Sequence, residues 1–121
     1  MLKQTLGKSK LEVSALGMGC WAIGGPWTWD QPGNPSFPAG WGTIDDDESI
    51  RAIHAALDMG VNFFDTAANY GAGHSEKVLG SALKGKRDQV VIATKFGHMV
   101  DEAKKSVYGD NDQIIKNVHI D

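Results

Sequence analysis

The order of apolar segments is the feature that most constrains how this chain can fold. Residues 45–59 and 75–84 place apolar side chains at helical spacing, whereas residues 61–64 and 89–94 are apolar runs too short to be helices. Each short run follows one of the helix-like segments. Parallel strands need crossover connections and are covered on both faces, so apolar strands that alternate with helices predict a parallel α/β sheet.

The segments before residue 45 extend this order. Residues 3–6 and 11–14 flank a turn near Gly7–Lys10 and predict a small hairpin, and residues 15–19 form a short apolar run suited to a buried strand. The predicted order is therefore hairpin, strand, helix, strand, helix, strand, within one domain that spans residues 1–121. Three parallel strands of this kind fit either a small doubly wound sheet or part of a (β/α)8 barrel.

Residues 21–43 hold all four tryptophans and all four prolines of the chain, and we predict a long irregular loop there. Loops longer than about 15 residues are usually functional or disordered, and the apolar surface of four tryptophans argues against disorder. Some tryptophans are expected to pack the loop and others to line a substrate pocket, with Trp21 nearest to a strand end. After Lys95 the chain turns polar, and no further strand is predicted before residues 114–121, where Asp121 suits a helix start.

Composition limits the class of protein. The 121 residues carry 12 Lys and Arg against 15 Asp and Glu, and 41% are hydrophobic, which is typical of a globular chain without a basic surface for nucleic acid. No apolar run reaches about 18 residues and the N-terminus lacks a signal-peptide core, so neither a membrane span nor export is expected. The single Cys20 excludes an internal disulfide and agrees with a cytoplasmic location.

Ionisable side chains follow the predicted strands at their carboxyl ends. Asp65 comes directly after residues 61–64, Tyr70 follows five residues later, and Lys95 comes directly after residues 89–94. Functional residues of parallel α/β folds gather at this edge, so these side chains are expected to converge. A lysine beside a tyrosine eases ionisation of the phenol, and a carboxylate orients the lysine, so the tyrosine can give a proton to a carbonyl oxygen. Each residue alone also has an ordinary structural explanation, and no His, Cys, Asp or Glu spacing predicts a metal site.

Three blocks of the sequence carry a resemblance to a known family. They are LGKSKLEVSALGMGCWAIGG, GVNFFDTAANYGAGHSEKVLG and VVIATKFG, and together they cover about residues 2–97. The chain resembles the N-terminal part of an aldo-keto reductase of the bacterial type with a long first βα loop. The resemblance implies the start of a (β/α)8 TIM barrel whose bottom is closed by the hairpin. It also implies an enzyme that reduces aldehydes or ketones with NADPH.

The resemblance assigns roles to particular residues. Tyr70 would be the general acid, Lys95 the group that eases its ionisation, and Asp65 the partner of Lys95. Cys20 and Trp21, together with Asp65, would approach the nicotinamide ribose of the cofactor. The family's fourth catalytic residue, a histidine, follows a fourth strand that lies beyond the three predicted here.

With three of eight barrel strands, the 121-residue chain by itself is expected to be inactive. Its unpaired strand edges are expected to make it self-associate or pair with the missing part of the barrel. Two other functions stay open at this point. Lys95 could serve as the Schiff-base nucleophile of a barrel lyase, or the chain could belong to a non-catalytic, nucleotide-binding regulatory subunit.

Overall fold

A parallel sheet forms the centre of the structure, a computed structural model that describes residues 1–108. The sheet has three strands in the order β3-β6-β7, namely β3 (Met18–Gly19), β6 (Phe63–Asp65) and β7 (Val91–Ala93). Both pairings are parallel, and Gly19, Asp65 and Ala93 lie side by side across the three strands. The predicted parallel sheet is thus confirmed, although each strand is shorter than its apolar run.

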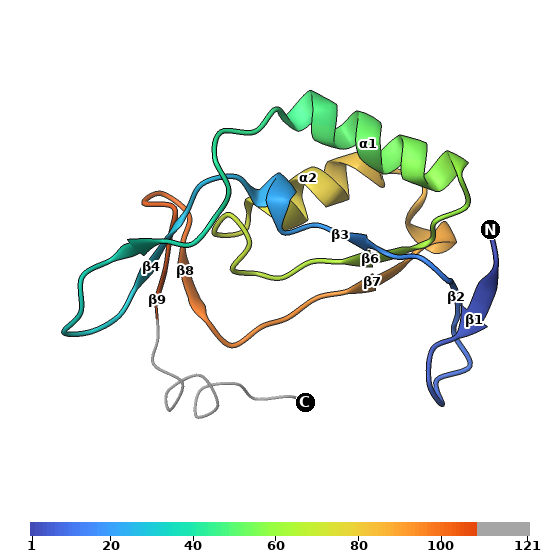
Figure 1. Cartoon of the computed structure of the whole chain (residues 1–121), viewed down its shortest axis with the longest axis horizontal. Coiled ribbons are helices and arrows are strands. Elements are labelled where there is room, and N and C mark those ends of the chain that lie inside the picture. The colour runs from blue at the N-terminus through green and yellow to red at the C-terminus, as the bar shows by residue number, and fades with distance from the viewer. Residues whose placement is uncertain (109–121) are drawn as a thin grey trace.

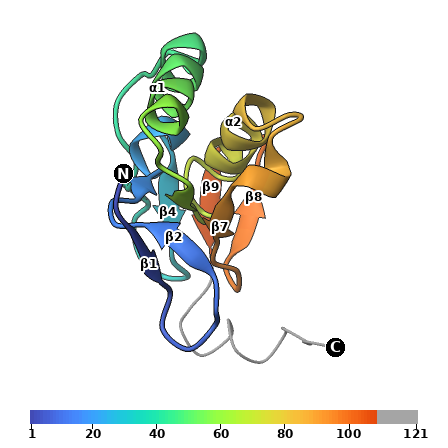
Figure 2. The same cartoon turned by 90° about the vertical axis from the view of Figure 1, so that its right-hand side faces the viewer.

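Two helices cover one face of this sheet. They are α1 (Asp46–Asp58) and α2 (His74–Ala82), and Figures 1 and 2 show both on the same side of the central strands. Phe64 points from β6 into the core between sheet and helices, where it is fully buried together with Ile53 and almost completely buried Leu79. The alternation of helix and strand that the sequence predicts is therefore present, with one apolar layer holding it together.

The acidic run before α1 acts at the helix terminus. The Asp45 carboxylate accepts hydrogen bonds from the backbone N–H groups of Asp47 (2.8 Å) and Glu48 (3.1 Å). Asp45 is the N-cap, and the carboxylates that follow it lie in the first turn, where the positive end of the helix dipole favours them. These acids are accounted for by helix capping.

The predicted hairpin is formed by β1 (Lys3–Thr5) and β2 (Glu12–Ser14), which pair antiparallel. It is tied to the start of β6 by a reciprocal pair of hydrogen bonds. Ser14 N–H donates to Asn62 Oδ1 (2.6 Å), and Asn62 N–H donates to Ser14 Oγ (3.0 Å). The hairpin therefore lies at the N-terminal ends of the central strands, opposite the edge where Asp65 lies (Figure 1).

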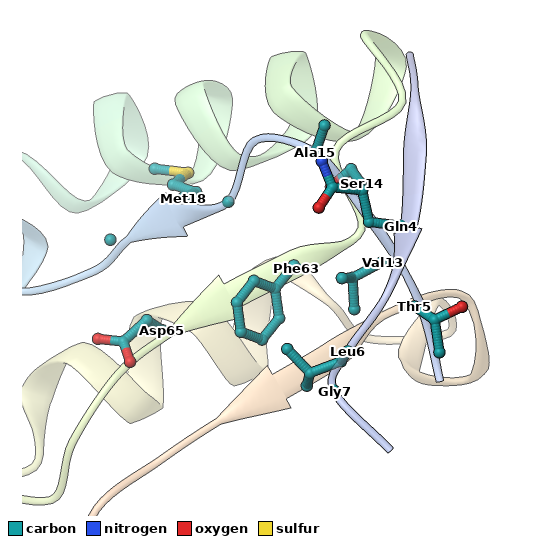
Figure 3. Close-up of a pocket in the computed structure, with 12 residues that line it drawn as sticks. Gln4, Thr5, Leu6, Gly7, Val13, Ser14, Ala15, Met18, Phe63 and Asp65 are labelled. Carbon is teal, nitrogen blue, oxygen red and sulfur yellow. The ribbon is translucent and has the colours of Figure 1, made fainter. Parts of the chain in front are cut away.

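The face of the sheet that points away from the helices is uncovered by residues 1–108, apart from the hairpin. A pocket of about 530 Å³ opens there between the hairpin, β3 and β6. Figure 3 shows Phe63 and Asp65 of β6 in its lining, with Leu6 and Val13 of the hairpin. Neither β3 nor β7 has a second strand partner in the described part of the chain, so the barrel is not closed. The fold is the first portion of a (β/α)8 barrel.

A second sheet, which the apolar pattern does not predict, lies beyond the C-terminal ends of the central strands (Figure 1). It has the order β5-β4-β9-β8, with β4 (Thr28–Asp30), β5 (Phe37–Pro38), β8 (Met99–Asp101) and β9 (Ser106–Tyr108). The prediction that residues 21–43 are irregular was wrong, and so was the absence of strands after Lys95. β4 pairs in parallel with β9, far away in the sequence, and such a pairing leaves no local sequence signal. Pro38 is tolerated because β5 is an edge strand.

This second sheet has a small core of its own. Trp27, Ala72 and Val107 are buried together there, with the half-buried Trp29 packed against them. The tryptophan-rich loop therefore does pack, as its composition predicts. The last segment singled out in the sequence, 114–121, lies outside the described residues.

Candidate active site

An ion pair joins the ends of β6 and β7. Lys95 lies two residues beyond β7, and its Nζ donates to Asp65 Oδ1 (2.8 Å) and Oδ2 (2.9 Å) and to the backbone carbonyl of Thr66 (2.9 Å). The position of Lys95 is fixed by the backbone as well, because the Ala68 N–H donates to the Lys95 carbonyl (3.0 Å). The ammonium thus donates to three acceptor atoms, which orient it.

Tyr70 lies beside this ion pair. The Lys95 ammonium is 5.0 Å from the centroid of the Tyr70 ring, within the range of a cation–π contact. On another side, the ring lies 6.3 Å from the Trp21 ring, which comes from the end of β3. Residues from the ends of all three central strands therefore meet at one place, as their positions in the sequence predict.

Two tryptophans form an exposed aromatic wall next to Tyr70. Trp21 is 45% exposed, and its ring makes an edge contact with that of Trp41 at 5.9 Å. Trp27 and Trp29, by contrast, belong to the core of the second sheet. The packing of Trp27 and Trp29 confirms one part of the sequence prediction, whereas the lining of a substrate pocket by the other tryptophans stays a prediction. Nothing in the sequence, however, indicates that Trp41 reaches Trp21 from the far end of the loop.

The turn that carries Tyr70 is held by close backbone contacts. Gly71 has a φ of +63°, and a Cβ placed on it would lie 2.0 Å from the carbonyl oxygen of Gly24. A Cβ on Gly24 would in turn lie 2.7 Å from the backbone of Tyr70 and Gly71. Gly24 ends the 3-10 helix η1 (Ala22–Gly24), which follows Trp21, so the segments after β3 and β6 touch backbone to backbone. The glycines of the GAGHSE stretch serve this turn, as predicted.

The neighbours of Lys95 change the pKa of its ammonium group. Burial by itself disfavours the ammonium, but the hydrogen bond to Asp65 and the nearby Tyr70 outweigh it, so the pKa of Lys95 is raised above its usual value. Lys95 is therefore a firmly protonated cation at neutral pH. A positive charge therefore lies beside the Tyr70 ring.

Cys20 is placed differently from its neighbour Trp21. Its side chain is fully buried in the core between sheet and helices, and Sγ lies 3.7 Å from the Met18 carbonyl. Burial, followed by the charge of Asp65, raises the pKa of the Cys20 thiol to about 11. The structure does not bring this side chain to the open edge of the sheet with Asp65 and Lys95.

Neither a cluster of metal-binding side chains nor a membrane-spanning helix occurs among the described residues. Among residues 1–108, no group of three or more His, Cys, Asp or Glu side chains is placed to hold a metal ion. No helix in this part of the chain is both long and apolar enough to cross a membrane.

A family model and curated relatives of known sequence all match this chain to the same family. The Aldo/keto reductase family model matches residues 15–121. The chain is 46% identical over 87 residues to the aldo-keto reductase YhdN of Bacillus subtilis (strain 168), covering 70% of this chain and 22% of that protein. It is 38% identical over 122 residues to the NADH-specific methylglyoxal reductase of Escherichia coli (strain K12), covering 98% of this chain and 33% of that protein.

Solved structures agree. The holo form of the aldo-keto reductase AKR11C1 from Bacillus halodurans superposes with a TM-score of 0.69 and 32% identity, covering 91% of this chain and 30% of that one. An aldo-keto reductase from Klebsiella pneumoniae in complex with NADPH gives a TM-score of 0.56 and 28% identity, covering 78% of this chain and 28% of that one.

The fold and the site edge define the class of protein as the opening part of a (β/α)8 barrel with an Asp–Lys–Tyr group at the carboxyl ends of its strands. The chain belongs to the aldo/keto reductase family. It spans between 22% and 33% of the length of the four relatives and structures compared above.

Proposed function

We propose that a complete barrel carrying this chain as its N-terminal part, referred to below as the complete reductase, reduces aldehydes or ketones with NADPH. Tyr70 is the general acid, and its hydroxyl proton passes to the substrate oxygen as the carbonyl is reduced to an alcohol. Lys95 offsets the negative charge that develops on the phenol oxygen, and Asp65 holds Lys95 in place. The observation that carries the proposal is the position of the Lys95 ammonium, bonded to Asp65 and 5.0 Å from the Tyr70 ring.

The cofactor part of the proposal rests on the exposed edge of the site. The Trp21 ring and the Asp65 carboxylate are accessible there and suit the nicotinamide and its ribose, whereas the buried Cys20 side chain does not. When bound, the nicotinamide cofactor supplies the reducing equivalent. A relative is named as NADH-specific and a similar structure contains NADPH, so both cofactors belong in the assay. We expect the complete reductase to oxidise NADPH in the presence of a carbonyl substrate, and no turnover with either cofactor would refute the proposal.

A Schiff-base lyase is less well supported by the same site. A lysine nucleophile must be neutral to attack a carbonyl, and it is usually prepared by a lowered pKa. The pKa of Lys95 is raised instead, because Asp65 and Tyr70 stabilise its charge. Borohydride treatment in the presence of substrate is therefore expected to leave Lys95 unmodified. The other alternative, a non-catalytic binding subunit, is separated from the reductase by the Tyr70 variant discussed below.

The isolated 121-residue chain is expected to show no carbonyl reduction. Its described residues provide the Asp65, Tyr70 and Lys95 side chains, but an open sheet leaves the site unenclosed, and enclosure strengthens the electrostatic effects on which catalysis depends. NADPH oxidation measured on the purified chain tests this directly. NADPH-dependent turnover by the purified chain alone would contradict the expectation.

We also expect the isolated chain to self-associate. The outer edges of β3 and β7 have no partner strand among residues 1–108, and open edges favour pairing with other chains. Light scattering after size exclusion should show a mass that falls on dilution. Val91→Lys places a charge on the β7 edge and should shift the chain towards monomer, whereas Asn34→Lys in an exposed turn should not. A dilution-independent monomer would contradict this expectation.

A further inference from the structure

Two buried hydroxyl groups lie next to the segments that carry the candidate site residues. Ser75 is 0% exposed and Thr66 is 2% exposed. Ser75 Oγ lies 2.6 Å from the backbone carbonyl oxygen of Cys20 and 3.0 Å from Thr66 Oγ1. Ser75 belongs to the first turn of α2, and Thr66 directly follows β6, so the pair joins a helix start to a strand end.

The direction of these hydrogen bonds follows from the chemistry of the groups. The Cys20 carbonyl can only accept, so the single hydroxyl proton of Ser75 is committed to it. Ser75 Oγ must then accept in its contact with Thr66, whose hydroxyl is the donor. The result is a series of two hydrogen bonds with one donor direction, from Thr66 to Ser75 and from Ser75 to Cys20. Each hydroxyl group in it has a partner, as buried polar groups require.

Both ends of this series of hydrogen bonds lie on segments that carry site residues. Cys20 directly precedes Trp21, and Thr66 directly follows Asp65. The Thr66 carbonyl accepts a hydrogen bond from the Lys95 ammonium (2.9 Å). The backbone N–H of Ser75 also donates to the Tyr70 carbonyl (3.2 Å). Ser75 is therefore hydrogen-bonded to the turn of Tyr70 through its backbone N–H and to the residue after β3 through its hydroxyl group. Its hydroxyl group also contacts Thr66, the residue after β6 whose carbonyl accepts from Lys95.

We propose that Ser75 is a positioning residue, which sets the distance between Tyr70, Lys95 and Trp21 by joining the three segments that carry them. This role rests on the reductase function proposed above, and Ser75 itself does not touch the reacting atoms. Loss of the hydroxyl keeps the backbone bond from Ser75 to the Tyr70 carbonyl but removes the side-chain bonds to Cys20 and Thr66, so that the side chain no longer holds these segments together. Small misplacements of this kind act on kcat, because they disturb the geometry of the reacting groups.

The test compares Ser75→Ala with wild type in the complete reductase. We expect kcat to fall by about 10- to 100-fold, the loss that a displacement of about 1 Å produces, while KM for the carbonyl and the Kd for NADPH change less than about twofold. Ser75→Cys, which keeps the size and a weak donor, should recover part of the lost kcat. A Ser75→Ala variant with kcat within twofold of wild type would overturn the inference. A wild-type protein without turnover would instead refute the proposed function, so the two failures are distinguishable.

Ser49→Ala is the matched control for a merely structural loss. Ser49 is also buried in the first turn of a helix, but this helix is α1, and its Oγ donates to the Asp45 carbonyl (2.9 Å) and not to a site residue. Ser49→Ala is expected to keep wild-type kcat per folded molecule. If Ser75→Ala loses activity only in proportion to its loss of folded protein, as this control would, the positioning role is wrong.

If Ser75→Ala does not fold, a pair of Thr66 variants tests the positioning role of Ser75. Thr66→Val keeps the shape of the side chain and removes the donor to Ser75, whereas Thr66→Ser keeps the hydroxyl. We expect kcat of Thr66→Val to be about 3- to 10-fold below that of Thr66→Ser, less than for Ser75 because the bond to Cys20 survives. Equal kcat values in the two variants would overturn the inference.

Discussion

Tyr70→Phe is expected to lower kcat of the complete reductase by a factor of about 10²–10⁴, the usual contribution of a positioned general acid. The substitution removes only the hydroxyl group. The ring that contacts Trp21 at 6.3 Å and lies under the Lys95 ammonium is retained, so packing is preserved. Binding of the nicotinamide cofactor should therefore change little. Steady-state kinetics with saturating NADPH, together with fluorescence titration of the cofactor, measure the two quantities separately.

The control for this variant is the only other tyrosine of the chain. Tyr108 ends β9 in the second sheet, and Tyr108→Phe removes a hydroxyl group without touching the Asp65–Lys95 pair. It should keep kcat within about twofold of wild type, since the half-buried Tyr108 lies outside the group of side chains whose geometry is proposed to decide kcat. If Tyr70→Phe behaves like this control, Tyr70 is not the proton donor. Unchanged turnover would exclude the general-acid role, whereas lost turnover with intact cofactor binding would exclude a purely non-catalytic subunit.

Local patterns in the sequence were sufficient for the central layer of the fold. The spacing of apolar residues predicts both helices, and the apolar runs predict β6 and β7 to within a few residues. The meeting of Asp65 with Lys95 follows from the same information, because parallel neighbouring strands bring their carboxyl ends to one edge. That meeting is confirmed by the geometry, while the catalytic roles of both residues stay predictions.

Local patterns in the sequence do not predict which distant strands pair or which way a side chain points. The pairing of β4 with β9 depends on two loops that meet only in the folded chain. The direction of Cys20 depends on the alternation along β3, where Gly19 faces the side of Asp65 and Cys20 faces the helices. Glycine gives no apolar or polar signal, so this alternation cannot be seen in the sequence. Ser75 was missed for a different reason, since a serine near a helix start is ordinarily read as a capping residue.

The close approach of Gly71 to Gly24 leads to the largest expected effect on stability. Gly71→Ala places a Cβ 2.0 Å from the Gly24 carbonyl oxygen, and neither partner is a flexible side chain that can move aside. The residue also has a φ of +63°, a conformation that costs an L-residue about 1–2 kcal/mol. Overpacking adds about 1–3 kcal/mol, so the free energy of unfolding should fall by about 2–5 kcal/mol.

Gly7→Ala separates the two parts of this cost. Gly7 has a φ of +54°, close to that of Gly71, but a Cβ placed on it meets no atom within 4 Å. Urea unfolding of the complete reductase should therefore show a loss of only about 1–2 kcal/mol for Gly7→Ala, the conformational part alone. The excess loss in Gly71→Ala measures the backbone contact between the segments that follow β3 and β6. Equal losses in the two variants would mean that this contact relaxes freely. Because Tyr70 precedes Gly71 directly, a real excess should be accompanied by a lower kcat in Gly71→Ala and by an unchanged kcat in Gly7→Ala.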